Sequence, residues 1–190
     1  IGAGPSARVM QISIEKFTLI GATTRLGLLS RPLRDRFGIP LQLEFYGPDD
    51  LQKILLLNAK KLKVEIDENA ALEIAKRSRG TPRIAIRLLK RIIDFSIVQN
   101  SKNINMNIVL KSLKQMRIDS EGLDEMDRKY LKCISIDYNG GPVGIETISA
   151  ALLEQRDIIE DVIEPYLMQR GLVQRTSRGR QALDKTFTYL

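Results

Sequence analysis

The segment Gly80–Ala85, with the sequence GTPRIA, constrains the fold of this chain more than any other. Thr81 suits the N-cap of a helix, and Pro82 suits the first helical position, where its missing N–H would have no partner anyway. Ile84 and the apolar residues after it recur at helical spacing. The segment therefore predicts a helix that begins at Pro82 and has Arg83 in its first turn.

Arg83 is a cation at the end of a helix where the macrodipole is already positive. This position disfavours a cation unless an anion lies nearby, and a helix N-terminus itself attracts anions. The arrangement favours a phosphate site. The alternative is a surface arginine that follows a common Thr-Pro cap, and this segment alone does not separate the two interpretations.

Composition narrows the class of protein. The chain has 190 residues, of which 43% are hydrophobic and 28% charged, as in a soluble globular protein. It has no apolar run of membrane-spanning length and no signal peptide, and because it does not begin with Met we expect a fragment. The net charge of +7 favours polyanionic partners, nucleic acid first, although many basic proteins bind none.

Two residue counts limit the possible chemistry. The chain has no histidine, and Cys133 is its only cysteine. A lone cysteine forms no internal disulfide, so we interpret Cys133 as a buried thiol in a reducing compartment. The counts argue against a protein zinc site, and we predict no metal ligands. Any chemistry must rest on carboxylates, Arg, Lys, Thr or a bound nucleotide.

Residues 1–45 predict one edge of an α/β sheet. Phe17–Ala22 is a short apolar run typical of a buried strand, and Leu41–Phe45 alternates like a second strand. A short helical turn, Leu28–Gly38, lies between them. Two strands cannot cover a core, so this segment is too small to be a domain by itself.

Residues 46–118 predict a small helical bundle. Amphipathic runs begin at Pro48, after Asp67 and at Pro82, and a last helix begins at Asn105 or Asn107. Glycine and proline separate these helices. The segment 119–122 that follows, Asp-Ser-Glu-Gly, is the best candidate for a linker.

Residues 119–190 predict a winged-helix module. Three helical patterns, the last of which contains Pro165, precede two short strands at Gly171–Arg175 and Gln181–Leu183. The hairpin tip between the strands, Thr176–Arg180, is basic. Three helices followed by a basic hairpin is the outline of a relative of the helix-turn-helix DNA binders. A solvated basic turn is the alternative.

Two more features bear on nucleotide chemistry. Thr23 and Thr24 end the first predicted strand, where α/β proteins place ligand contacts, although such threonines are usually structural. Arg36, beside Phe37, could offer a permanently charged guanidinium to a neighbour's phosphate. The alternative for Arg36 is a surface salt bridge within the sequence Arg-Asp-Arg. Each of these features, including Arg83, is weak evidence by itself. Their order and spacing in one chain are what make the nucleotide-binding interpretation specific.

Taken in order, these motifs closely resemble the RuvB family, the AAA+ motor of Holliday-junction branch migration in bacteria. The resemblance covers nearly the whole chain and implies a mixed α/β fold. Its parts would be a piece of the AAA+ P-loop domain (1–45), a small helical lid domain (46–118) and a winged-helix head (119–190). The motifs are FTLIGATTR (17–25), PLRDRFG (32–38), LEFY (43–46), RGTPRIA (79–85), GLDEMD (122–127) and QRTSRGR (174–180).

The resemblance also implies roles for single residues. Thr24 matches sensor 1, which helps place the hydrolytic water, and Arg36 matches the arginine finger that acts on the neighbouring subunit's ATP. Tyr46 and Arg83 match nucleotide contacts, Arg83 being sensor 2 on the lid. The DNA-contacting positions of the head match three arginines: Arg156, Arg175 and Arg180.

The family further implies a cofactor and partners. The cofactor would be ATP or ADP with Mg²⁺, and the substrate would be double-stranded DNA at four-way junctions. A homo-oligomeric ring, with a hexamer expected, would act with the junction-recognition protein RuvA and the resolvase RuvC. The location would be the bacterial cytoplasm, with no membrane involved.

The sequence departs from the family in one large respect. The family's Gly-rich loop with Lys and Ser/Thr, and its acidic Walker B strand, are not in these residues. Gly2 and Gly4 are no substitute, because no Lys-Ser/Thr pair follows them. We therefore expect an ATP-hydrolysing DNA helicase when the protein is intact, and no hydrolysis by this chain alone.

Two other functions stay open on the sequence alone. A non-enzymatic winged-helix DNA-binding protein would explain the basic hairpin but not residues 17–37 or Arg83, and selectivity for one operator sequence would favour it. A clamp-loader-like or replication-origin AAA+ protein is the other alternative, because such proteins use the same kinds of nucleotide-sensing residues. Preference for four-way junctions would separate it from a branch-migration motor.

Overall fold

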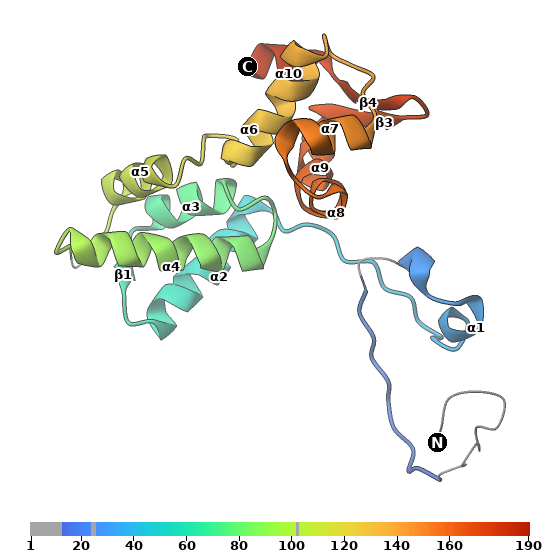
Figure 1. Ribbon diagram of the computed structural model, residues 1–190. Coiled ribbons are helices and arrows are strands. Elements are labelled where there is room, and N and C mark those ends of the chain that lie inside the picture. The colour runs from blue at the N-terminus through green and yellow to red at the C-terminus, as the bar shows by residue number, and fades with distance from the viewer. Residues whose placement is uncertain (1–12, 24–25, 102) are drawn as a thin grey trace. The chain divides into compact units, whose positions relative to one another are not determined.

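The computed structural model describes residues 13–23, 26–101 and 103–190. The chain divides into two compact units, Ile1–Leu43 and Glu44–Leu190 (Figure 1). The predicted sensor residue Thr24 lies outside the described residues.

The described part of the first unit contains two short helical turns, η1 (Leu26–Leu28) and α1 (Arg31–Arg34). The strands predicted at Phe17–Ala22 and Leu41–Phe45 are wrong for this structure, because neither segment pairs with another strand among the described residues. Their apolar side chains are exposed, Ile20 to 89% and Leu43 to 92%. A strand needs a neighbour that accepts its backbone hydrogen bonds and covers its apolar face, and the pattern alone supplies neither.

The second unit begins with the predicted helical bundle, coloured cyan to yellow-green in Figure 1. The apolar faces of its helices meet in one core that includes Leu51, Ile74 and Leu89. Asn105 is the N-cap of the last helix and accepts a hydrogen bond from the Ile108 N–H. The elements are α2 (Pro48–Lys61), α3 (Glu68–Lys76), α4 (Pro82–Val98), α5 (Met106–Gln115) and the parallel strands β1 (Glu65–Ile66) and β2 (Asn103–Ile104).

The start of α4 confirms the prediction from the GTPRIA segment. Thr81 is the N-cap and Pro82 is the first helical residue. The Thr81 hydroxyl donates to the Ser78 carbonyl at 3.3 Å rather than capping the helix. Gly80 has φ +69°, and a Cβ there would lie 2.8 Å from the Cβ of Phe45, so the turn requires glycine. Phe45 and the turn before α4 are therefore closely packed.

The rest of the second unit has its own core, built around Tyr130, Ile148 and Leu167. Three helices followed by a hairpin confirm the winged-helix outline (Figure 1, yellow to red). The elements are α6 (Glu125–Lys132), the π-helical turn η2 (Cys133–Asp137), α7 (Ile145–Leu152), α8 (Arg156–Ile158), the π-helical turn η3 (Ile159–Ile163), α9 (Glu164–Gln169), β3 (Val173–Thr176), β4 (Gly179–Ala182) and α10 (Asp184–Tyr189).

The third helix of the head contains Pro165 without being broken. It runs from α8 through η3 into α9, and the π-helical turn ends two residues before the proline. Proline lacks an N–H and its ring crowds the carbonyl four residues earlier. A π-helical turn shifts the hydrogen-bond register by one residue and so accommodates this mismatch. The helix therefore continues and presents Glu160 and Glu164 one turn apart.

The hairpin of β3 and β4 is antiparallel, with Arg175 directly opposite Arg180. Val143 and Arg180 exchange two backbone hydrogen bonds, at 2.8 and 2.7 Å, which tie the hairpin to the segment before α7. Gly179 has φ +136°, and a Cβ there would lie 2.3 Å from the Val143 carbonyl oxygen. Only glycine allows this close approach.

Candidate nucleotide and DNA sites

Arg83 is an exposed cation in the first turn of α4. Its side chain makes no hydrogen bond or ion pair with any described residue. No acidic residue lies in the first turn of α4 either. A guanidinium beside a positive helix end with no counter-charge fits an anionic ligand such as a phosphate.

Tyr46 lies against the same turn. Its backbone N–H donates to the Gly80 carbonyl at 2.9 Å, and the residue is 49% exposed. The preceding residue, Phe45, packs on Gly80. The structure therefore brings Tyr46 to the segment that leads into Arg83, although 37 positions separate them in the sequence.

Arg36 follows α1 in the first unit and is exposed. Its backbone N–H donates to the Leu33 carbonyl at 3.2 Å. No ion pair with Asp35 forms among the described residues, so the alternative of an Arg-Asp-Arg salt bridge is not what holds it. Phe37 is half-buried and its ring lies close to Gly21, which anchors the turn.

The two arginines of the hairpin converge on a buried carboxylate. Arg180 Nε donates to Glu164 Oε1 at 2.8 Å, and Arg175 Nε donates to Glu164 Oε2 at 2.5 Å. The Tyr130 hydroxyl also donates to Glu164 Oε1, at 2.9 Å. Like charges opposite each other on a hairpin are unfavourable, and Glu164 offsets this repulsion from below the sheet. Burial, and then the charge of Glu164, raises the pKa of Tyr130.

The third predicted DNA arginine joins the same network. Arg156 Nε lies 3.0 Å from Glu160 Oε2, and its Nη1 lies 3.3 Å from Glu146 Oε1. The other oxygen of Glu160 lies 2.6 Å from Arg180 Nη2. Arg156, and with it Arg180, lowers the pKa of Glu160.

The structure therefore brings Arg156, Arg175 and Arg180 together, but not as free cations. Arg180 is only 12% exposed in its side chain, whereas Arg156 is 55% exposed. Arg178, at the hairpin tip, is exposed and its side chain has no partner among the described residues. Sequence reasoning missed Glu160 and Glu164, and their spacing of four residues beside Pro165 was the only signal.

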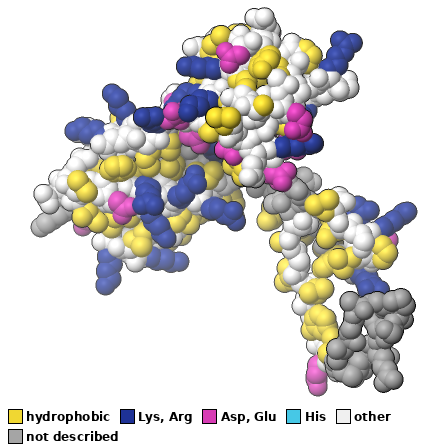
Figure 2. Space-filling view, viewed as in Figure 1, with side chains coloured by type: hydrophobic (Ala, Val, Ile, Leu, Met, Phe, Trp, Pro, Cys, Tyr) yellow, Lys and Arg dark blue, Asp and Glu magenta, His cyan; other side chains and the backbone are white. Residues whose placement is uncertain are grey.

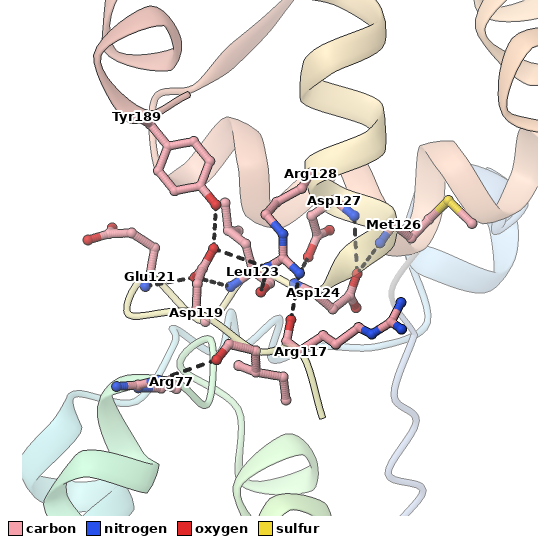
Figure 3. A network of polar contacts seen from close by, with 12 residues as sticks. Arg77, Arg117, Asp119, Glu121, Leu123, Asp124, Met126, Asp127, Arg128 and Tyr189 are labelled. Atoms are coloured by element: carbon pink, nitrogen blue, oxygen red, sulfur yellow. Dashed lines mark hydrogen bonds and ion pairs between the residues drawn. The ribbon is translucent and has the colours of Figure 1, made fainter. Parts of the chain in front are cut away.

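A second polar network lies where the helical bundle meets the head (Figure 3). Asp119 accepts hydrogen bonds from the backbone N–H groups of Glu121 and Leu123, both at 2.9 Å. Its other oxygen accepts from Arg128 and from the Tyr189 hydroxyl. The segment 119–122, expected to be a linker, is thus a tightly bonded connection, because Asp119 satisfies its backbone donors.

Arg79, four residues before Arg83, crosses this junction. Its guanidinium donates to the Gly122 carbonyl at 2.9 Å and to Asp127 at 2.5 Å, and it lies 5.0 Å from the centre of the Tyr166 ring. Burial raises the pKa of Asp127 to about 6, against the opposing effect of Arg79. Nothing in the sequence around Arg79 indicates this role, because its partner Asp127 lies 48 residues away.

Three further properties of the described residues concern thiols, metal ligands and membrane spans. Cys133 is a buried free thiol, and burial raises its pKa. No group of three or more Cys, Asp or Glu side chains within residues 13–23, 26–101 and 103–190 is arranged to hold a metal ion. None of the described helices is both long enough and apolar enough to cross a membrane.

Comparisons with known protein families match the chain in three consecutive parts. The Holliday junction DNA helicase RuvB P-loop domain matches residues 1–43. The RuvB AAA lid domain matches residues 46–119, and the RuvB C-terminal winged helix domain matches residues 120–190. The chain therefore has a piece of a P-loop domain, a lid and a winged helix in the order that the resemblance predicts.

Curated relatives and solved structures agree with this match. The chain is 62% identical over 180 residues to the Holliday junction branch migration complex subunit RuvB of Orientia tsutsugamushi strains Ikeda and Boryong. The match covers 95% of this chain and 55% of each relative, so the chain spans about half the length of these proteins.

Among solved structures, the RuvB Holliday junction branch migration motor of Thermotoga maritima is 52% identical, with a TM-score of 0.85. This match covers 93% of this chain and 59% of that one. A mutant of the same protein gives a TM-score of 0.86 at 52% identity, over 94% of this chain and 60% of that one. The chain belongs to the RuvB family.

Proposed function

We propose that this chain is part of an ATP-driven DNA translocase that moves the branch point of Holliday junctions in recombination and repair. The relatives are named for branch migration. The observation that supports the proposal most is Arg83, an exposed cation without an acidic residue in its turn at the start of α4, with Tyr46 bonded to Gly80 in the segment just before it. A surface arginine can also lack a partner, as Arg87 does among the described residues, but Arg83 lies in the first turn of α4, where the positive helix end favours an anion beside it.

The residues present fit part of a nucleotide site. Arg83 and Tyr46 would contact the nucleotide from the lid, and Arg36 would reach the nucleotide of a neighbouring subunit. Thr24 would help to place the water. ATP with Mg²⁺ supplies the phosphoryl group, and a Gly-rich loop and an acidic pair outside this sequence would hold it. This chain alone would not hydrolyse ATP.

The head would grip double-stranded DNA through its arginines. Arg156, Arg175 and Arg180, with Arg178 at the tip, would neutralise phosphates, and such contacts do not depend on base sequence. A motor that passes over any sequence needs contacts of this kind. Figure 2 shows further basic side chains over the lid and the head, in accord with a polyanionic partner. A hexameric ring that works with RuvA and RuvC in the bacterial cytoplasm is part of the same proposal.

The test uses the full-length protein that contains this chain. We expect Arg36→Ala to lower the DNA-stimulated ATPase rate by about 10³-fold or more. In mixed rings, Arg36→Ala subunits should impair ATP hydrolysis by unmodified neighbours. A normal rate in Arg36→Ala rings would contradict the assignment of the finger.

A matched pair of variants tests Arg83. Arg83→Ala should raise the KM for ATP, while Arg91→Ala, on the same helix but ion-paired with Asp94, should not. Equal effects of the two substitutions would indicate a general loss of positive charge and would contradict the sensor role. Binding to one operator sequence, without ATPase activity in the full-length protein, would favour a winged-helix regulator instead.

A further inference from the structure

The cluster around the hairpin is balanced in charge. Three guanidinium groups, from Arg156, Arg175 and Arg180, face three carboxylates. The carboxylates are Glu146, Glu160 and Glu164. The arginines proposed to bind DNA therefore already have anionic partners, and a DNA phosphate must compete with those partners.

The carboxylates of Glu164 and Glu160 differ in access. The side chain of Glu164 is fully buried and holds Tyr130, Arg175 and Arg180 from inside the fold. The side chain of Glu160 is 24% exposed and faces the outermost of the arginines, Arg156. A buried ion pair with several hydrogen bonds is costly to open, whereas an exposed pair is weak and exchanges readily. Both carboxylates on Arg156, Glu146 and Glu160, are accessible enough for a phosphate to replace them, and Glu160 is the one that also holds a hairpin arginine, Arg180.

A carboxylate and a phosphate present similar acceptor oxygens to a guanidinium. An arginine held by a carboxylate is already oriented to receive a phosphate, but it adds less net attraction than a free arginine. Each phosphate that a free cation neutralises also releases counterions, so the number of free cations sets the salt dependence of binding.

We propose that Glu160 is a positioning residue that takes the place of a DNA phosphate in the free head. It orients Arg156 and Arg180, and a phosphate displaces it from Arg156 when DNA binds. The exchange keeps this DNA contact weak, which suits a contact that is made and broken during translocation. The inference rests on the proposed DNA binding by the head.

The test is the salt dependence of DNA binding by the full chain, measured by fluorescence anisotropy with a labelled four-way junction and a labelled duplex. Glu160→Gln keeps a side-chain oxygen for Arg180 but removes the charge. We expect the affinity to rise about 3- to 10-fold near 0.1 M salt, and the slope of log K against log salt to steepen by about 0.9, because no displaced carboxylate then offsets the cation that meets the phosphate. An unchanged slope, or weaker binding, would overturn the proposal.

Asp157→Asn is the matched control. It removes the same charge from the same helix, and Asp157 has no ion pair among the described residues. We expect its slope to equal that of the wild-type chain. A slope as steep as that of Glu160→Gln would overturn the proposal, because it would show a general charge effect. Adding Arg156→Ala to Glu160→Gln should abolish the gain, and a gain that persists would also overturn it.

Two further outcomes keep the test decisive. If Glu160→Gln does not fold, Glu146→Gln releases Arg156 from its second carboxylate, which is 78% exposed. We then expect a smaller change in the same direction, and no change would overturn the proposal. A wild-type chain that binds neither DNA would contradict the proposed function, whereas normal wild-type binding with no effect of Glu160→Gln would contradict only this inference.

Discussion

The arginines of the lid and of the head are the same residue type in opposite situations. Arg83 is exposed and has no partner among the described residues. Arg180, in the head, is 12% exposed and is held by Glu160 and Glu164. The lid leaves this cation without a partner among the described residues, whereas the head uses a cation to build its hairpin. Net charge alone does not distinguish these two uses.

The difference shows that a basic hairpin is not simply a positive surface. Arg175 and Arg180 lie opposite each other and would repel without Glu164 beneath them. The wing is therefore folded by the same residues that it would use to bind. Substitutions in the head should combine effects on stability and on binding, while substitutions at Arg83 should affect binding alone.

The largest expected effect comes from Glu164→Gln. Removing one partner of a buried ion pair leaves the other charge uncompensated, so we expect the free energy of unfolding to fall by about 3 kcal/mol. Urea unfolding followed by circular dichroism measures it. Asp157→Asn, an exposed carboxylate on the same helix, should change it by less than about 0.5 kcal/mol. Equal losses of unfolding free energy in the two variants would contradict the distinction between ion-paired and unpaired charged side chains.

Arg79 extends the comparison, because it is an arginine of the lid whose side chain is ion-paired within the fold. Its partner Asp127 has a pKa of about 6 in the folded chain and 3.8 when unfolded. Between pH 3.8 and 6, Asp127 is protonated in the folded chain and ionised in the unfolded chain. This group therefore contributes to the free energy of unfolding at about pH 4, and the contribution is lost as the pH rises through 6. The loss is at most about 3 kcal/mol.

Asp127→Asn removes this titration. Its free energy of unfolding should vary less between pH 4 and 6.5 than that of the unmodified chain, as measured by urea unfolding at each pH. Glu125, an exposed neighbour whose pKa Arg117 lowers, provides the control Glu125→Gln. A pH profile that Asp127→Asn leaves unchanged would show that the Arg79 junction does not set it.

The smallest expected effect on stability is at Arg178, the arginine of the head that resembles Arg83. Its side chain has no partner among the described residues, so Arg178→Ala should leave the unfolding free energy within about 0.5 kcal/mol. The slope of log K against log salt for duplex binding should become shallower by about 0.9, because one phosphate contact is lost. Unchanged DNA binding would place the hairpin tip outside the interface.

Much of the fold could be predicted from local signals. Thr81 and Pro82 mark the start of α4, and Asn105 marks the start of α5. Two short strands on either side of a basic tip predict the hairpin of β3 and β4, although Thr176 and Arg180, expected in the tip, lie in the strands. Each of these signals acts within a few residues, so the sequence shows it directly.

The rest depends on partners that are distant in the sequence. The strands predicted around Ile20 and Leu43 have no pairing neighbour among the described residues. Glu164 meets Tyr130 across 34 positions, and Arg79 meets Asp127 across 48. A basic hairpin predicts DNA contact, but only the three-dimensional arrangement shows which of its arginines are already paired.

The most direct test of the contrast between unpaired and ion-paired arginines makes the same substitution at Arg83 and at Arg180. Arg83→Met and Arg180→Met remove the same charge and keep most of the side-chain volume, and urea unfolding of the two variants compares them. The contrast predicts a loss of about 3 kcal/mol for Arg180→Met and a change within about 0.5 kcal/mol for Arg83→Met. Equal losses, or a larger loss at Arg83, would contradict it.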